Sequence, residues 1–265
     1  MLIAQLSDPH VCGEKILYQG LVDSNAMLAA AVRHLNALSP APDVVILTGD
    51  VTENGTPEEY ANSRKLLSEI KQPLIVIPGN HDQRDAFRAG FSDKDYLPKA
   101  GPIHFAVSGL GDVRIVALDV TVPGAHHGDI DDTAIAWLET CLAEEPDRPT
   151  ILMLHQPPFR SGIPYLDQYR CFGAERLEGL LQSYNNVELV VCGHVHRFMV
   201  RRFAGTVICT APSTTTSIAL RLAADAEPAS FIEPPALLLH HWSANSGLTT
   251  HYVPIGQLPG PYDFF

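Results

Sequence analysis

Short apolar runs alternate with longer amphipathic stretches through the first three quarters of this chain, and this alternation predicts a layered α/β protein. The predicted strands are 2–6, 44–48, 74–77, 114–118, 150–154 and 188–192. The predicted helices are 24–38, 56–70, 131–144 and 174–183. Several of the strands are apolar at consecutive positions, as expected for strands that are covered on both faces.

The last quarter of the chain has a different pattern, with strand-like pieces at 200–203, 207–209, 237–242 and 248–253. The length of 265 residues allows one large domain or two small ones. Because no internal repeat and no clear linker divides the sequence, we expect a single domain over residues 1–265.

Five polar clusters follow five of the predicted strands, just beyond the carboxyl end of each. They are residues 7–10, 49–50, 79–82, 155 and 193–196. Ligands of open α/β sheets gather at this edge, so five separate segments are expected to deliver polar side chains to one place. Gly49, Gly79 and Gly193 precede the polar residues, as suits turns where the backbone approaches a ligand closely.

The side chains of these clusters form a donor set for metal ions. Asp8 and His10 are two residues apart, as are His194 and His196, and residues i and i+2 of an extended chain project to the same side. Carboxylate, imidazole and amide donors without cysteine suit first-row metals such as Fe, Mn, Co or Zn. Seven donors are too many for one tetrahedral ion but suit two ions, with Asp50 between them. The seven candidate metal ligands are Asp8, His10, Asp50, Asn80, His155, His194 and His196.

In this order the clusters resemble the calcineurin-like metallophosphoesterase superfamily, whose pattern is D-x-H, G-D, G-N-H-[DE], a lone His and G-H-x-H. The resemblance implies two metal ions per chain. It assigns Asp8, His10, Asp50 and His196 to one ion, and Asp50, Asn80, His155 and His194 to the other. It also implies a four-layer α/β/β/α sandwich of two mixed β-sheets flanked by helices. The β-rich portion from about residue 200 to 265 would complete the second sheet and contribute a contact in a homo-oligomer such as a dimer.

Within the superfamily, the chain looks most like bacterial class III cyclic nucleotide phosphodiesterases and glycerophosphodiesterases, including the run TGDVTENGTPEEY at 48–60. Protein phosphatases of the superfamily usually carry Asp-Arg-Gly soon after the second motif and Glu in the third. Here residues 51–55 read VTENG, and Asp82 stands in the third motif. This departure weighs against the phosphoprotein phosphatase branch.

The expected reaction is hydrolysis of a small phosphodiester, such as a cyclic nucleotide or a glycerophosphodiester. Two divalent ions lower the pKa of bound water to about 7, so a metal-bridging hydroxide would attack phosphorus in line. The family motif retains His81 without using it as a ligand. We therefore expect Asn80 and His81 to bind the substrate and His81 to assist departure of the leaving alkoxide.

Two alternatives remain open. A phosphomonoesterase of the same superfamily would usually need additional Arg side chains to hold the dianion. A non-catalytic metal-binding scaffold would not need all seven donors.

The charge balance restricts the partners, because 18 Lys and Arg against 30 Asp and Glu give a net charge of −12. Long nucleic acids and anionic lipids are bound mainly by Lys and Arg, so neither is expected, and a DNA nuclease is unattractive. The apolar runs are too short for a membrane span, and the amino terminus does not read as a signal peptide. Five widely spaced cysteines fit a reduced compartment. We expect a cytoplasmic protein without membrane contact.

Other polar residues receive structural interpretations. Asp82 precedes a predicted short helix at 83–89 and is expected to cap it. The remaining histidines are expected to be exposed rather than functional: His34, His104, His126, His127, His240, His241 and His251. Arg160, Tyr165, Tyr169 and the Ser/Thr run at 213–217 are expected to be solvated loop residues, with substrate contact left open.

Overall fold

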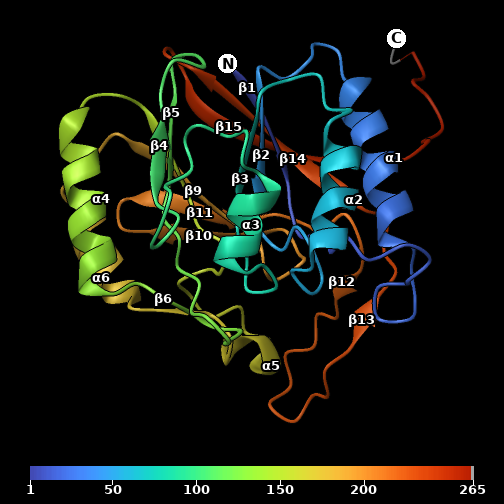
Figure 1. Cartoon of the computed structure of the whole chain (residues 1–265). Helices are drawn as coiled ribbons and strands as arrows, with labels where there is room; N and C mark the ends of the chain where they lie inside the picture. The colour runs from blue at the N-terminus through green and yellow to red at the C-terminus, as the bar shows by residue number, and fades with distance from the viewer. Residues whose placement is uncertain (264–265) are drawn as a thin grey trace.

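The computed structural model describes residues 1–263 and contains two large mixed β-sheets (Figure 1). The first sheet has five strands in the order β15 (Gly247–Pro254), β14 (Ala236–Ser243), β1 (Leu2–Leu6), β2 (Val44–Thr48) and β3 (Leu74–Ile77). The second sheet has six strands in the order β10 (Met199–Phe203), β11 (Thr206–Thr210), β9 (Val187–Cys192), β7 (Thr150–Met153), β5 (Arg114–Ala117) and β4 (Phe105–Val107). Two short pairs lie outside these sheets: β12 (Ser217–Ile218) with β13 (Ser230–Phe231), and β6 (Gly128–Asp129) with β8 (Cys171–Phe172).

The strands that precede the polar clusters run parallel within each sheet. β1 pairs with β2, and β2 pairs with β3, in the first sheet; β7 pairs with β9 in the second. Parallel neighbours end at the same edge of a sheet, so the segments that follow these strands are brought together.

The helices cover the outer faces of the two sheets (Figure 1). Those on the side of the first sheet are α1 (Ser24–Asn36), α2 (Pro57–Leu67) and α3 (Arg84–Gly90), and those on the second are α4 (Asp132–Glu144) and α6 (Ala174–Leu181). The short α5 (Pro164–Asp167) lies in the loop after β7. Helix α2 begins as its sequence requires, because Thr56 and Glu59 form a reciprocal capping box and Pro57 occupies the first turn.

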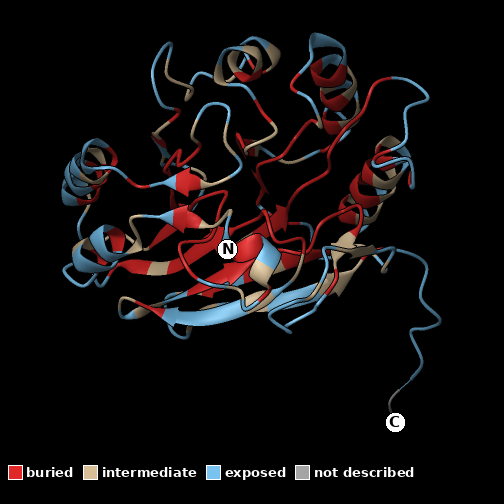
Figure 2. Ribbon diagram, turned by 90° about the horizontal axis from the view of Figure 1, so that it is seen from below, coloured by how far each residue is buried: buried red, intermediate tan, exposed pale blue. Residues whose placement is uncertain are grey.

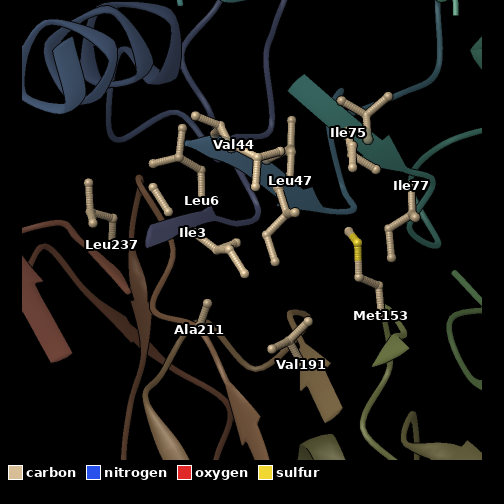
Figure 3. Packing of buried hydrophobic residues seen from close by; sticks show 14 of the residues in the cluster. Ile3, Leu6, Val44, Leu47, Ile75, Ile77, Met153, Val191, Ala211 and Leu237 are labelled. Carbon is tan, nitrogen blue, oxygen red and sulfur yellow. The ribbon is translucent and has the colours of Figure 1, made fainter. Parts of the chain in front are cut away.

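The space between the sheets is filled by apolar side chains from both (Figure 3). In β7, Ile151 and Met153 face the first sheet, whereas Leu152 packs in the cluster under α4 and α6. In β9, Val191 faces the first sheet and Val190 faces the helices. Both sides of these strands are covered, which explains their consecutive apolar residues. Figure 2 shows the result: the interior strands are buried, and the outer turns of the helices are exposed.

The predicted four-layer arrangement is confirmed, and the six predicted strands and four predicted helices occur within a few residues of their predicted bounds. The portion after residue 200 differs from the expectation, because its strands join both sheets: β10 and β11 extend the second, and β14 and β15 extend the first beside β1. The pattern also missed β4 and the two short strand pairs. Within residues 1–263, no helix has the length and apolar character needed to cross a membrane.

Candidate metal centre

The five polar clusters meet at the carboxyl edge of both sheets. Nε2 of His196 lies 3.5 Å from Oδ1 of Asp8 and 3.0 Å from Nε2 of His10. Nε2 of His10 lies 3.7 Å from Oδ2 of Asp50, and the same oxygen lies 3.2 Å from Nε2 of His155. The carboxylate of Asp50 therefore lies between two groups of donors.

Three three-residue groups have ligand atoms within 4.8 Å of one another. Asp8, His10 and His196 form the first cluster, Asp50, His155 and His194 form the second cluster, and His10, Glu53 and His81 form the third group. Asn80 joins the second cluster, with Oδ1 3.2 Å from Nε2 of His155. The structure thus brings all seven candidate residues together. Their function as metal ligands stays a prediction.

The carboxylates and imidazoles of both clusters are buried, with exposed fractions from 0% for Asp8 to 8% for His194. Asn80 and His81 are partly exposed. Ionisable groups withdrawn from water in this way are costly unless they pair with one another or coordinate a metal ion.

The backbone is strained at the same positions. Residues with positive φ angles, between 43° and 70°, include Asp8, His10, Asp50, His194 and His196. This left-handed conformation costs of order 1–3 kcal/mol at a non-glycine residue and persists where the surrounding structure holds it, often at ligand sites. The strain therefore coincides with the candidate donors.

All three glycines allow the segments to approach as predicted, and a Cβ on Gly79 would overlap the carboxylate and main-chain nitrogen of Asp50. A Cβ on Gly49, whose φ is +93°, would overlap the ring of His155. A Cβ on Gly193 would overlap the side chains of Ser7 and Asp8. Any larger residue at either position would separate the two sheets at the site.

The outer nitrogen of three of the imidazoles is fixed by an oxygen acceptor. Nδ1 of His10 lies 2.7 Å from Oε2 of Glu53. Nδ1 of His155 lies 2.7 Å from the carbonyl of Thr48, and Nδ1 of His196 lies 2.9 Å from the carbonyl of Thr216. A ring that donates from Nδ1 keeps its lone pair on Nε2, which points into the centre.

These contacts fit a centre built for cations. Nε2 of His10 and Nε2 of His196 face each other, and two lone pairs at 3.0 Å repel unless a cation lies between them. Nε2 of His194 is buried and lacks a hydrogen-bond partner in the described part of the chain. Imidazole nitrogens with carboxylate and amide oxygens are suitable donors for Fe, Mn, Co or Zn.

The charge states of the metal-free protein differ between residues. Burial holds the pKa of His10 and of His194 well below the usual value, so both rings are neutral at pH 7. Burial also acts against ionisation of Asp50, but His155 and His81 keep the pKa of Asp50 well below its usual range. Burial acts likewise against the charged form of His155, but the carboxylate of Asp50 raises its pKa to about 9. An Asp50–His155 ion pair therefore forms in the absence of metal.

His81 lies at the rim of the centre, where its ring is held by the main chain. Its Nδ1 lies 2.8 Å from the carbonyl of Glu53, and its main-chain N–H donates to Oδ1 of Asp50 over 2.9 Å. Burial lowers the pKa of His81, but the charges of Asp50 and Glu53 outweigh it and raise the pKa above the usual value. A protonated ring at this position could donate to a ligand through Nε2.

A pocket of about 280 Å³ opens over the centre. Besides five of the candidate ligands and His81, its lining includes Tyr18, Gln19, His126, Tyr165, Tyr169, Ile218 and Ser230. A second pocket of about 640 Å³ shares Asn80 and His81 with it and continues toward Arg84 and Arg88. The loop with Tyr165 and Tyr169 thus overhangs the centre, whereas Arg160 is exposed to solvent.

The expectation for Asp82 was wrong. The residue before α3 that takes the cap position is Gln83, and it makes no side-chain cap hydrogen bond. The buried carboxylate of Asp82 instead accepts from the main-chain N–H groups of Val51 and Gly79 and from the hydroxyl of Tyr60. Asp82 therefore ties the turn after β2 to the turn after β3.

Other expectations were also corrected. His126, His241 and His251 are exposed as expected, but His34, His104 and His127 are partly buried and His240 is completely buried. His126 also lies at the pocket, with Nδ1 3.3 Å from Nδ2 of Asn80. The Ser/Thr run is not a solvated loop, because its residues 213–216 are buried behind the centre.

Glu53 was missed by the sequence reasoning, although it contacts His10 and follows Asp50 by only three residues. The available signal was the position of Glu53 within the run TGDVTENGTPEEY, close to the second motif. Its direction toward His10, 43 residues away in the chain, follows from the tertiary structure alone.

Comparisons with known proteins agree with this geometry. Residues 1–198 match the family described as calcineurin-like phosphoesterase. The protein named probable glycerophosphodiester phosphodiesterase GpdQ from Arcobacter nitrofigilis is 36% identical over 266 residues, covering 100% of this chain and 97% of the relative. The 3′,5′-cyclic adenosine monophosphate phosphodiesterase CpdA of Escherichia coli K12 is 28% identical over 219 residues, covering 80% and 75% of the two chains.

A dimetal phosphatase from Danio rerio has the same fold, with a TM-score of 0.64 at 12% identity over 97% of this chain and 99% of that chain. The family match spans all five polar clusters and ends two residues after the fifth. This chain therefore belongs to the calcineurin-like phosphoesterase family.

Proposed function

We propose that this protein is a metal-dependent phosphoric diester hydrolase that acts on a small phosphodiester. The observation that carries the proposal is the convergence of seven buried or half-buried N and O donors from both sheets beneath a small pocket. The relatives named as glycerophosphodiester and cyclic nucleotide phosphodiesterases support the same reaction class.

The donors would hold two ions, with Asp50 shared between them. Asp8, His10 and His196 would complete one position, and Asn80, His155 and His194 the other. When bound, the ions would supply positive charge for the phosphoryl oxygens and a water molecule that ionises near neutral pH. Because the donor set suits several first-row metals, we propose Fe, Mn, Zn or Co without choosing among them.

The chain's own residues bind and orient the diester. The amide of Asn80 and the ring of His81 lie at the boundary between the centre and the pocket, where the phosphoryl group would be held. His81 donates Nδ1–H to the carbonyl of Glu53, which leaves Nε2 available to donate to a leaving group. The raised pKa of His81 keeps this proton available near neutral pH, and it can pass to the departing alkoxide.

The role of His81 has a direct test. His81→Ala should lower diester turnover by about 10²- to 10⁴-fold, the usual contribution of a general acid, while metal content stays normal. Unchanged turnover at normal metal content would show that His81 does not assist departure.

The substrate is tested by a panel of 3′,5′-cyclic nucleotides, 2′,3′-cyclic nucleotides and glycerophosphodiesters on apo-protein reconstituted with Mn, Zn, Fe or Co. Bis(4-nitrophenyl) phosphate compared with 4-nitrophenyl phosphate separates a diesterase from a monoesterase. Turnover of the monoester alone would favour the phosphomonoesterase alternative. A chain that binds two ions and hydrolyses none of these substrates would be a scaffold.

We further propose a cytoplasmic enzyme that forms a homo-oligomer. Five buried, unpaired cysteines are typical of a reducing compartment and therefore support a cytoplasmic location. Exposed apolar side chains at Leu220, Leu222, Phe231 and Ile232 support a contact surface in the β-rich portion. Light scattering of the purified protein tests the oligomer.

A further inference from the structure

A continuous chain of hydrogen bonds crosses the first sheet and ends on the candidate ligand Asp8. Oγ1 of Thr250 on β15 lies 2.8 Å from Nδ1 of His240 on β14, and Nε2 of His240 lies 3.1 Å from Oε1 of Gln5 on β1. Nε2 of Gln5 donates to Oγ1 of Thr48 over 3.0 Å. The chain then reaches Asp8 through Ser7, as the next contacts show.

The last two steps of the chain are hydrogen bonds donated by hydroxyl groups. Oγ1 of Thr48 donates to Oγ of Ser7 over 2.7 Å, and Oγ of Ser7 donates to Oδ2 of Asp8. The main-chain N–H of His194 also donates to the carboxylate of Asp8, over 2.9 Å to Oδ1. Two donors therefore fix the plane of the carboxylate, and Oδ1 remains directed toward His196, 3.5 Å away.

Each hydrogen bond in this chain has one allowed direction. Gln5 also donates to the carbonyl of Cys192 over 3.0 Å, which fixes its amide nitrogen on that side and its oxygen toward His240. His240 must then carry its proton on Nε2 and accept from Thr250 at Nδ1. Thr48 has a single hydroxyl proton and donates it to Ser7 over 2.7 Å, because the carbonyl of Leu6, its other acceptor, is farther away at 3.4 Å. All donors consequently point toward the carboxylate of Asp8.

The chain is unusual because it lies in the interior of the fold. His240, Gln5, Thr48, Ser7 and Asp8 are all 0% exposed. Burial lowers the pKa of His240 to about 3, in keeping with the neutral ring that the directions require. Apolar side chains in these positions would fill the core without introducing buried polar groups that need hydrogen-bond partners.

We propose that Gln5, Thr48 and Ser7, with His240 at the far end, are positioning residues that hold the carboxylate of Asp8 in the orientation in which it binds metal. This inference rests on the proposed metal-dependent function. Hydrogen bonds aligned in one direction polarise one another, and low dielectric strengthens them. Donors behind a ligating carboxylate hold its orientation, and substitution of such outer partners typically lowers metal affinity or activity by 10- to 100-fold.

The test compares substitutions that remove or retain a hydroxyl at nearly the same volume. Thr48→Val removes the donor to Ser7, and Thr48→Ser retains it. Thr150→Val is the matched control, because Thr150 is also 0% exposed and donates to the carbonyl of Arg148, which takes no part in this series of hydrogen bonds. His240→Leu and His240→Gln provide a second pair at the far end.

The measurement is the dissociation constant of each of two Mn²⁺ equivalents, by calorimetry on the full chain at pH 7.5, with urea unfolding of each metal-free variant. We expect Thr48→Val to weaken one equivalent about tenfold and leave the other unchanged, with Thr48→Ser and Thr150→Val close to wild type. We expect His240→Leu to weaken the same equivalent by a smaller factor, with His240→Gln restoring it.

A loss of stability in Thr48→Val with both Mn²⁺ constants unchanged would overturn the inference and leave the chain a purely structural network. If Thr48→Val does not fold, the His240 pair decides by the same criterion. Failure of the proposed function has a different signature, since wild-type protein would then bind no Mn²⁺ or hydrolyse no diester when loaded.

Discussion

The first cluster (Asp8, His10 and His196) and the second cluster (Asp50, His155 and His194) lie side by side but have different surroundings. Behind the first cluster, Glu53 accepts from His10 and Ser7 donates to Asp8. Behind the second cluster, Nδ1 of His155 contacts the neutral carbonyl of Thr48, and the neutral amide of Asn80 stands where a carboxylate could have been.

The difference is one of charge. Apart from the shared Asp50, the first cluster includes the carboxylate of Asp8 and has Glu53 behind it. In the described part of the chain, the side chains of the second cluster contact no further carboxylate, and only the main-chain N–H of His194 reaches Asp8. A divalent cation is attracted more strongly where more negative charge lies close to it in a medium of low dielectric. We therefore expect the first position to bind metal more tightly and the second to exchange its ion more easily.

The largest expected effect comes from substituting Asp50, the carboxylate that lies between the two clusters. Asp50→Asn should weaken both metal equivalents and lower diester turnover by more than about 100-fold, because substitutions behind a ligand already cost 10- to 100-fold. Metal analysis after dialysis, together with turnover of bis(4-nitrophenyl) phosphate, measures this. If Asp50→Asn retained one full equivalent of metal, Asp50 would be a ligand of one ion only.

A smaller effect is expected when only the first cluster is changed. Glu53→Gln removes the charge behind His10 and should weaken the tighter equivalent by about 10- to 100-fold while sparing the weaker one. Glu58→Gln is the control for charge, because Glu58 is exposed and contacts the main chain of Glu14 instead. Calorimetric titration with Mn²⁺ distinguishes the equivalents, and equal weakening of both would contradict the proposed asymmetry.

The smallest effect is a pH dependence specific to the second cluster. His155 has a raised pKa of about 9 in the metal-free protein, so a metal ion must displace its proton at pH 7. The affinity of the second equivalent should therefore rise about tenfold per pH unit up to about pH 9, with release of one proton. Titration in buffers of different ionisation enthalpy at pH 7 and 8 measures this.

The sign of the same shift applies to folding. Because its folded pKa exceeds 6.5, His155 contributes stability to the metal-free protein below about pH 6.5, and this contribution is lost as pH rises through about 9. An increase in metal-free stability over that range, measured by urea unfolding, would show that the Asp50–His155 pair does not form.

Much of the fold was predictable because its signals are local. Strands β1, β2 and β3 have the predicted bounds, since their mainly apolar runs end sharply at Gly or polar turns. Helix α2 was predictable from its capping residues Thr56 and Glu59. The strand β4 was missed because its three residues are too few for a periodic pattern.

The donors of the candidate site could be predicted from the sequence, but the residues that hold those donors in place could not. His10 and Asp50 stand in short motifs whose spacing shows in the sequence itself. The carboxylate of Asp82 reads locally as a helix cap, but packing turns it toward Val51 and Tyr60. His240 reads as an edge histidine, but β14 inserts beside β1 and buries it against Gln5.

The sequence alone therefore determined the identity and order of the seven candidate donors, because each depends on a strand, a turn and a few residues after it. The tertiary structure decided which groups stand behind those donors. Glu53, Thr216 and the chain from His240 to Ser7 reach their partners across the packed sheets. Such contacts depend on where whole strands lie relative to one another, and a local pattern of residues carries no information about that placement.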